Sequence, residues 1–224
     1  MDKIIEQVRP KLLIGISTRN KLPPKDKEDA LVERGSQVNA CCDVCGISID
    51  KNTRFTIEYK DMWFNACSMC YYTQNIDRIP HYIKGEIVFY PELSQERLYT
   101  LLRAIWSVEY FASIDGNNPK LEEMQASLSE LLESFSSLKD VTNGYVDTSN
   151  PDIISSMLNL LTDEEYKERY KLFTSFRWMP DKETFEDDIP RWAQQSFTHL
   201  SPDRMSSNIT KFMAKYVPSF KVNE

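Results

Sequence analysis

The residues best suited to chemistry in this chain are four cysteines in two C-x-x-C pairs, Cys42 with Cys45 and Cys67 with Cys70. Each pair can place two thiolates on one ion, and the 21 residues between the pairs suit a hairpin that returns to the first pair. Four thiolates at the corners of a tetrahedron form a closed structural zinc site, whereas a redox C-x-x-C needs only one pair. The spacing therefore predicts one bound Zn²⁺ with these four ligands.

Two neighbours of the first pair bear on how the site is built. Gly46 directly follows Cys45 and suits the tight backbone turn that a C-x-x-C pair makes. Cys41 could replace Cys42 in a C-x-x-x-C register, but Cys42 gives the better turn, so we expect Cys41 to be a small buried residue. With four sulfurs bound, the ion has no open position for water or substrate. The site therefore predicts a structural metal, with no catalytic role.

No other part of the sequence forms a recognisable catalytic site. The two histidines, His81 and His199, are not paired with a nucleophile, and we expect both at the surface or capping a helix. The phosphate-binding, dinucleotide-binding and nucleophile-elbow motifs are all absent from the sequence. We therefore predict no catalytic residues and no enzyme activity.

Composition and charge restrict the class of protein. The chain has 224 residues, of which 41% are hydrophobic. No apolar run approaches the ~18 residues that a membrane span needs, and the N-terminus has no signal-like apolar stretch, so we expect a cytoplasmic protein with a sizeable core. A net charge of −7 argues against direct nucleic-acid binding. Residues 121–165 contain ten acidic residues and one basic residue, Lys139. This stretch is either a solvated acidic face or a docking surface for a basic partner.

Periodicity and capping residues predict the elements that position the cysteines. Strand-like segments fall at 11–16, 54–59 and 85–90, with a charged stretch at 25–34. From residue 91 the pattern becomes helical, with starts at Ser94, at Asn118-Pro119, at Asn150-Pro151, at a Thr162–Glu165 capping box and at Ser201-Pro202. Pro190 should kink or restart a helix within 181–197.

These elements predict an α+β fold in two parts. Residues 1–90 form a zinc-binding module with an N-terminal extension, and residues 91–224 form a mainly helical half. We expect the two parts to pack as one body.

The cysteine segment resembles an HNH-type ββα-metal module, in which two C-x-x-C turns brace the fold and a histidine on a strand between them carries out cleavage. Here the corresponding strand, residues 55–61, has no histidine, and Tyr71 follows Cys70. The approach Asn65-Ala66-Cys67 to the second pair is retained. The resemblance therefore implies a retained scaffold without nuclease machinery.

The order of motifs along the chain resembles the IcmJ/DotN family of type IVB (Dot/Icm-like) secretion and conjugation systems. The likeness covers about residues 40–200 and rests on the cysteine pairs followed by Pro-Glu-Leu-Ser-Gln at 91–95, Phe-Arg-Trp-Met-Pro at 176–180, and Trp192-Ala193. It implies a non-catalytic zinc protein of the coupling complex. Such a protein binds the C-terminal tail of the coupling ATPase (DotL-like) beside other adaptors, peripheral to the inner membrane through these partners.

The sequence thus predicts a zinc-binding structural and adaptor subunit. Two alternatives remain open: an HNH-like metal-dependent nuclease, and a zinc-ribbon module that binds nucleic acid. An adaptor for a flexible tail needs apolar anchors. Seven aromatic residues are candidates for such anchors, or else fill the core: Trp106, Tyr110, Phe111, Phe173, Phe176, Trp178 and Trp192.

Overall fold

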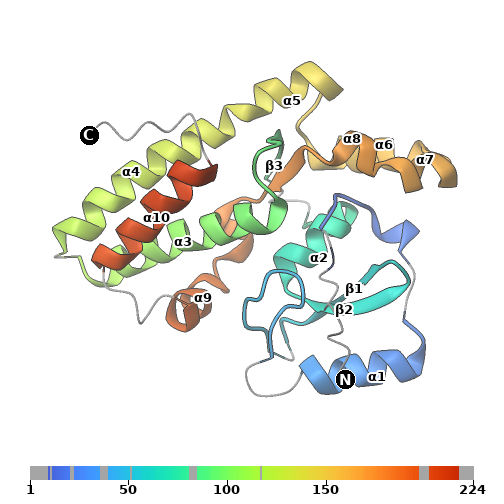
Figure 1. Cartoon of the computed structure of the whole chain (residues 1–224), viewed down its shortest axis with the longest axis horizontal. Coiled ribbons are helices and arrows are strands. Elements are labelled where there is room, and N and C mark those ends of the chain that lie inside the picture. Colours follow the sequence, from blue (N-terminus) through green and yellow to red (C-terminus); the bar gives the residue numbers. More distant parts are fainter. Residues whose placement is uncertain are drawn as a thin grey trace, which may run out of the picture.

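The computed structural model describes residues 10, 12–20, 23–35, 40–50, 52–80, 85–116, 118–196 and 202–216. Its fold is α+β, as predicted: helices predominate, and the described strands form two antiparallel two-stranded sheets (Figure 1). One sheet, formed by β1 (Phe55–Tyr59) and β2 (Met62–Ala66), lies beside the cysteines. The other sheet, formed by β3 (Glu86–Phe89) and β4 (Phe176–Met179), joins segments that are far apart in the sequence.

The first part of the chain folds around a β-hairpin. Strands β1 (Phe55–Tyr59) and β2 (Met62–Ala66) pair antiparallel with Ile57 opposite Phe64, which confirms the hairpin expected between the cysteine pairs. The hairpin is preceded by η1 (Ser17–Arg19) and α1 (Lys25–Gly35) and followed by α2 (Ser68–Gln74) and η2 (Ile76–Arg78). Helix α1 occupies the charged stretch at 25–34 and contacts β2.

The strand predicted at 11–16 is wrong for its described residues, 12–16, which form an extended segment outside any sheet. The side chains of Leu12, Ile14 and Ile16 are buried, as a strand pattern would suggest. The backbone, however, bonds to several different elements. The Gly15 N–H donates to the Thr73 carbonyl (3.1 Å) and the Ile16 N–H donates to the Tyr166 hydroxyl (2.9 Å). Burial without a neighbouring strand produced the misleading pattern.

Strand β4 (Phe176–Met179) was missed by the sequence analysis, which assigned only helices after residue 91. It pairs with β3 (Glu86–Phe89), with Ile87 opposite Trp178. The predicted boundary at residue 90 therefore falls directly after a strand whose partner lies in the helical half. All four residues of β4 are buried, so the segment lacks the alternation that marks a half-buried strand.

The predicted helix starts are confirmed where their caps are described. Asn118 and Asn150 accept backbone N–H groups at the N-termini of their helices, each with proline at the first position, and Thr162 and Glu165 form the capping box. Ser94 stands at the N-cap position, but its side chain makes no capping bond. The helices are α3 (Gln95–Ile114), α4 (Pro119–Ser136), α5 (Leu138–Val146), α6 (Pro151–Leu160), α7 (Asp163–Glu168) and α8 (Tyr170–Phe173).

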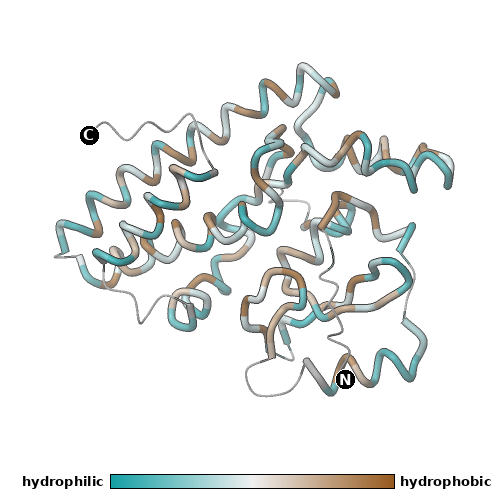
Figure 2. The backbone as a smooth tube through the Cα atoms, in the orientation of Figure 1, coloured by the Kyte–Doolittle hydropathy of each residue, from teal (hydrophilic) through white to brown (hydrophobic). Residues whose placement is uncertain are grey.

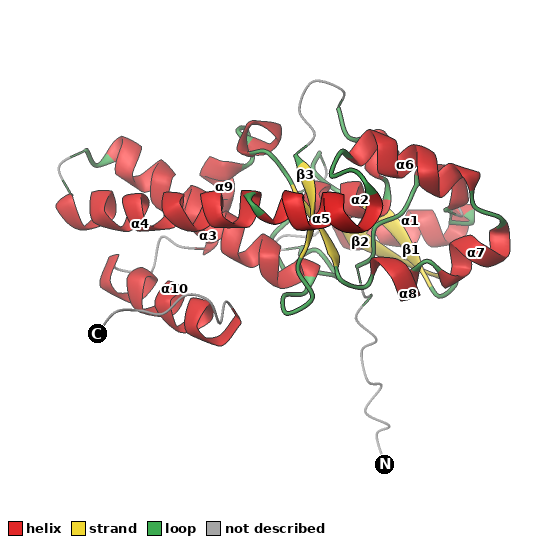
Figure 3. Ribbon diagram, turned by 90° about the horizontal axis from the view of Figure 1, so that it is seen from above, coloured by secondary structure: helices red, strands yellow, loops and turns green. Residues whose placement is uncertain are grey.

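The C-terminal elements return to α3 and α4. Pro190 does restart a helix: a 3₁₀ turn, η3 (Lys182–Phe185), ends before it, and α9 (Ile189–Ser196) has the proline in its first turn. Helix α9 packs on α3, and the last helix, α10 (Pro202–Tyr216), contacts α4. Seen from above in Figure 3, α3, α4, α9 and α10 gather on one side of the molecule, and α1, α6 and α7 on the other.

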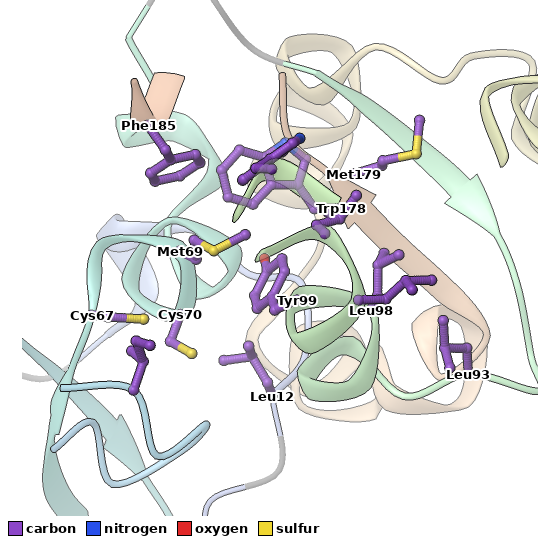
Figure 4. Packing of buried hydrophobic residues seen from close by; sticks show 14 of the residues in the cluster. Leu12, Cys67, Met69, Cys70, Leu93, Leu98, Tyr99, Trp178, Met179 and Phe185 are labelled. Carbon is purple, nitrogen blue, oxygen red and sulfur yellow. The ribbon is translucent and has the colours of Figure 1, made fainter. Parts of the chain in front are cut away.

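One continuous hydrophobic core joins both parts of the chain. It runs from Ile57 in the hairpin through Met69 and Tyr99 to Trp178 and Trp192. Figure 4 shows Met69 and Tyr99 between the second cysteine pair and Trp178. In Figure 2, apolar and polar residues alternate along α4, and its apolar residues Leu121, Leu128 and Leu131 are buried at helical spacing.

The aromatic residues predicted as partner anchors are mostly core residues, which corrects that expectation. Five of the seven are buried, and Tyr110 and Phe111 are partly buried against the same core. Trp106 stacks on Trp192, with ring centroids 6.5 Å apart. Because the five buried rings fill this core, those five are not available to a partner.

A candidate metal centre of four cysteines

The first cysteine pair sits in a tight hydrogen-bonded turn. The Cys42 N–H donates to the Ile47 carbonyl (2.8 Å), and the Gly46 N–H donates to the Cys42 carbonyl (2.9 Å). Gly46 has a φ of +76°, in the left-handed region that glycine adopts at no steric cost, as its position in the sequence predicted. The turn closes through an isolated β-bridge between Cys41 and Ser48.

The second cysteine pair lies at the start of helix α2. Cys67 is the N-cap residue, and Cys70 falls in the first turn, where the Tyr71 N–H donates to the Cys67 carbonyl (2.9 Å). A spacing of three residues on a helix brings two side chains to the same side, so both sulfurs face the first pair. The first turn of α2 thus places the sulfurs of Cys67 and Cys70 side by side, as the Gly46 turn does for Cys42 and Cys45.

Asn65 ties the two turns together. Its carbonyl accepts the Asp43 N–H (2.9 Å), and its own N–H donates to the Asp43 carboxylate (2.7 Å). Its buried side-chain amide donates to the Leu31 carbonyl (3.1 Å), which fastens helix α1 to the same place. These bonds give a physical role to the Asn65-Ala66 approach noted in the sequence.

The four sulfurs converge on one point. All four lie within 4.8 Å of one another, and the sulfurs of Cys45 and Cys67 are 3.7 Å apart. A disulfide would need about 2.05 Å, whereas zinc–sulfur bonds of about 2.3 Å in a tetrahedron place neighbouring sulfurs about 3.8 Å apart. Cys42, Cys67 and Cys70 are buried and Cys45 is half-buried, so the donor set fits a tetrahedral metal ion.

The pKa values of two of these thiols are shifted in opposite directions. Burial raises the pKa of Cys70 well above its usual value, and the neighbouring sulfurs raise it further. Hydrogen bonds to Cys42 and to the other sulfurs hold the pKa of Cys45 well below its usual value. Four adjacent thiolates repel one another, so ionisation of all four requires a bound positive charge.

Arg103 is the residue of this site that sequence reasoning missed. It lies on α3, is 4% exposed, and its Nη1 donates to the Cys45 sulfur (3.4 Å). Burial lowers its pKa, but the negative charge of Cys45, Cys67 and Cys70 outweighs that effect, and the pKa is raised. The signal in the sequence was a single arginine inside the apolar run 101–106.

The other residues singled out in the sequence do not join the cluster. The Cys41 side chain is exposed, which corrects the expectation that it is buried; its turn points it away from the core. His81 and His199 lie outside the described residues. Within the described part of the chain, the four cysteines are the only group of three or more metal-ligating side chains close enough to share an ion.

The motifs that carry the family resemblance contact each other. The side chain of Gln95 donates to the Trp178 carbonyl (2.7 Å) and accepts the Trp178 N–H (2.9 Å), and Arg177 donates to the Leu93 carbonyl. Residues 91–95 therefore cover the free edge of strand β4. This contact gives both motifs a structural role.

The fold and the site together define an α+β protein with a four-cysteine cluster suited to a metal ion. No protein-family model matches the chain, and no curated protein matches it either. Among the helices of the described ranges, none combines the length and the apolarity needed to cross a membrane.

Proposed function

We propose that Cys42, Cys45, Cys67 and Cys70 bind one structural Zn²⁺. The observation that carries this proposal is the convergence of four sulfurs within 4.8 Å in a largely buried site. A tetrahedral four-sulfur site suits zinc or iron, and zinc is the choice for a purely structural role because it has no redox chemistry. Zinc bound in this way contributes on the order of 10 kcal/mol to folding of its site.

The zinc unit is proposed to be a degenerate HNH-like module without nuclease activity. The chain order β1, β2, α2, with a cysteine pair on each side of the hairpin, supports that reading. Strand β1 carries no histidine, and a four-sulfur site leaves no open position on the metal. Phosphodiester cleavage needs both a general base and an accessible metal ion.

The chain as a whole is proposed to be an adaptor subunit of a type IV secretion coupling complex. It would bind the C-terminal tail of a DotL-like coupling ATPase beside other adaptors, without direct nucleic-acid binding. It would thus lie in the cytoplasm, peripheral to the inner membrane through these partners. The support is the resemblance carried by the cysteine pairs and by the motifs at 91–95 and 176–180.

An exposed apolar stripe on α6 supports a role in binding a partner. Ile153, Met157 and Leu160 follow one another at helical spacing and are 50%, 41% and 86% exposed, while Ile154 and Leu158 on the other side are buried. The stripe lies inside the acidic stretch 121–165. A flexible basic tail could bury these side chains to offset the cost of its ordering.

Metal analysis tests the zinc proposal. We expect about one zinc per purified chain, lost in Cys67→Ser together with a large fall in melting temperature, because the binding energy of the site is folding energy. The control is Cys41→Ser, which removes an exposed thiol next to the site and should keep the metal. A stable wild-type protein without metal would contradict the proposal.

Co-expression with the tail of the coupling ATPase tests the adaptor role. We expect co-elution in size-exclusion chromatography without nucleotide or DNA, weakened by the combined change Ile153→Ser, Met157→Ser and Leu160→Ser. The matched control removes three exposed apolar side chains from other elements: Val32→Ser, Met62→Ser and Ile114→Ser. Separate elution of wild-type protein and tail would refute the adaptor role, whereas tail binding retained by the α6 variant would refute only the stripe.

Two assays separate the adaptor from the alternatives. A nuclease would cleave plasmid DNA or RNA with magnesium or manganese and lose that activity on a point change within residues 55–61. A nucleic-acid-binding module would bind DNA with a steep salt dependence, because phosphate contacts release counterions. We expect neither result.

A further inference from the structure

Arg103 occupies an unusual position for a charged side chain. Its guanidinium is buried between helix α2 and helix α9, where it lies 6.0 Å from the centre of the Trp192 ring. Its hydrogen-bond acceptors are sulfur atoms: Cys45 Sγ at 3.4 Å and Met69 Sδ at 3.8 Å. Among the described residues, no carboxylate lies within ion-pair distance of it.

A buried guanidinium needs a nearby negative charge. Arginine remains protonated in proteins, and an unpaired charge in the interior is strongly unfavourable. Four neutral thiols would supply no countercharge. Four thiolates around a divalent ion carry a net charge of −2. The positive charge of the Arg103 guanidinium would neutralise part of it.

We propose that Arg103 is the countercharge of the metal centre and the positioning residue that fixes helix α3 to it. The inference rests on the proposed zinc site and goes beyond it, because it makes the helical half a part of that site. The N–H···S bond to Cys45 withdraws charge from that sulfur and offsets part of the negative charge of the loaded site. Loading of the metal and docking of α3 are therefore coupled.

The alternative is a purely structural arginine. Its aliphatic stem packs in the core and its guanidinium lies near the Trp192 ring, so truncation could destabilise the protein without any electrical role. The two roles differ in what happens at the sulfur atoms. Only a countercharge changes the affinity for metal and the energy of the sulfur lone pairs.

The test compares Arg103→Met, which keeps the apolar stem, with Arg103→Lys, which keeps the charge, in the full chain. The matched control is Arg97→Met, an exposed arginine on the same helix. Zinc affinity is measured by competition with a chelator, and the cobalt-loaded proteins are examined by absorption spectroscopy. We expect Arg103→Met to bind zinc about 10–100-fold more weakly, the effect typical of losing an outer-shell partner. We expect Arg103→Lys to recover most of that loss and Arg97→Met to match the wild type.

The spectrum gives a readout that packing alone does not move. Loss of the N–H···S bond raises the sulfur lone pairs in energy, so the sulfur-to-cobalt charge-transfer band of Arg103→Met should shift to longer wavelength. Unchanged zinc affinity and an unshifted band would overturn the role of Arg103 while leaving the zinc site intact. If Arg103→Met does not fold, the zinc affinity of Arg103→Lys decides the question. An affinity as weak as that of a cysteine variant would overturn the role of Arg103 as countercharge. A wild-type chain without bound zinc would overturn the zinc site, and this inference with it.

Discussion

Replacing Gln95 with methionine should destabilise the protein while leaving its metal site filled. The Gln95 amide makes two hydrogen bonds to the backbone of Trp178, at 2.7 and 2.9 Å, and its side chain is buried. Strand β3 does not supply those bonds, because the N–H of Ile87, opposite Trp178, donates instead to the Ser149 carbonyl. Methionine has a similar length and cannot form either bond, so a buried N–H and a buried carbonyl lose their partner.

The expected magnitude follows from these two groups. Each of the two buried groups left unpaired costs about 1–3 kcal/mol, and the apolar methionine side chain returns about 1 kcal/mol, so the net loss of stability is about 1–5 kcal/mol. For a chain of this size, a loss of that magnitude corresponds to a fall in melting temperature of about 2–20 °C.

Urea unfolding followed by tryptophan fluorescence measures the loss, and metal analysis of the same sample measures zinc content. Gln195→Met, at an exposed position of α9, is the control and should stay within about 0.5 kcal/mol of the wild type. A loss below about 1 kcal/mol for Gln95→Met would show that water or another group pairs with the Trp178 backbone.

Three further changes test the backbone geometry, each by thermal or urea unfolding. Gly85→Ala should lower the free energy of unfolding by more than about 2 kcal/mol, because Gly85 has a φ of +65° and a Cβ there would clash with the backbone of β4 and Pro180. The control is Gly144→Ala, in an open helical position, which should be neutral or stabilising. The β1–β2 turn has positive φ at two residues, Lys60 (53°) and Asp61 (59°). Replacing them with Asn-Gly should therefore stabilise the chain by about 1 kcal/mol. A loss of stability would mean that the contacts of these two side chains contribute more than the relief of turn strain. Thr162→Ala removes the capping box and should cost about 1 kcal/mol, and no change would show that α7 is held by packing alone.

Local chemistry determined what the sequence alone could predict. Each cysteine pair is positioned by a local turn: the Gly46 turn for Cys42 and Cys45, and the first turn of helix α2 for Cys67 and Cys70. The four candidate ligands could therefore be predicted from residues close together in the chain. The helix starts at Asn118, Asn150 and Thr162 were equally predictable, because a cap bonds to groups two or three residues away. The identity of the metal stays a prediction that rests on ligand chemistry, and the partner stays a prediction that rests on resemblance.

Only the tertiary structure decided features whose partners are distant in sequence. Strand β4 exists because β3 and the Gln95 side chain, 83 residues from Trp178, provide its hydrogen bonds. Leu12, Ile14 and Ile16 are buried without forming a strand because the backbone of this segment bonds to other elements. Arg103 lies at the four-cysteine cluster because the fold brings helix α3 within hydrogen-bond distance of Cys45. In each case a buried polar group must find a partner wherever the fold brings one, and no local pattern in the sequence identifies that partner.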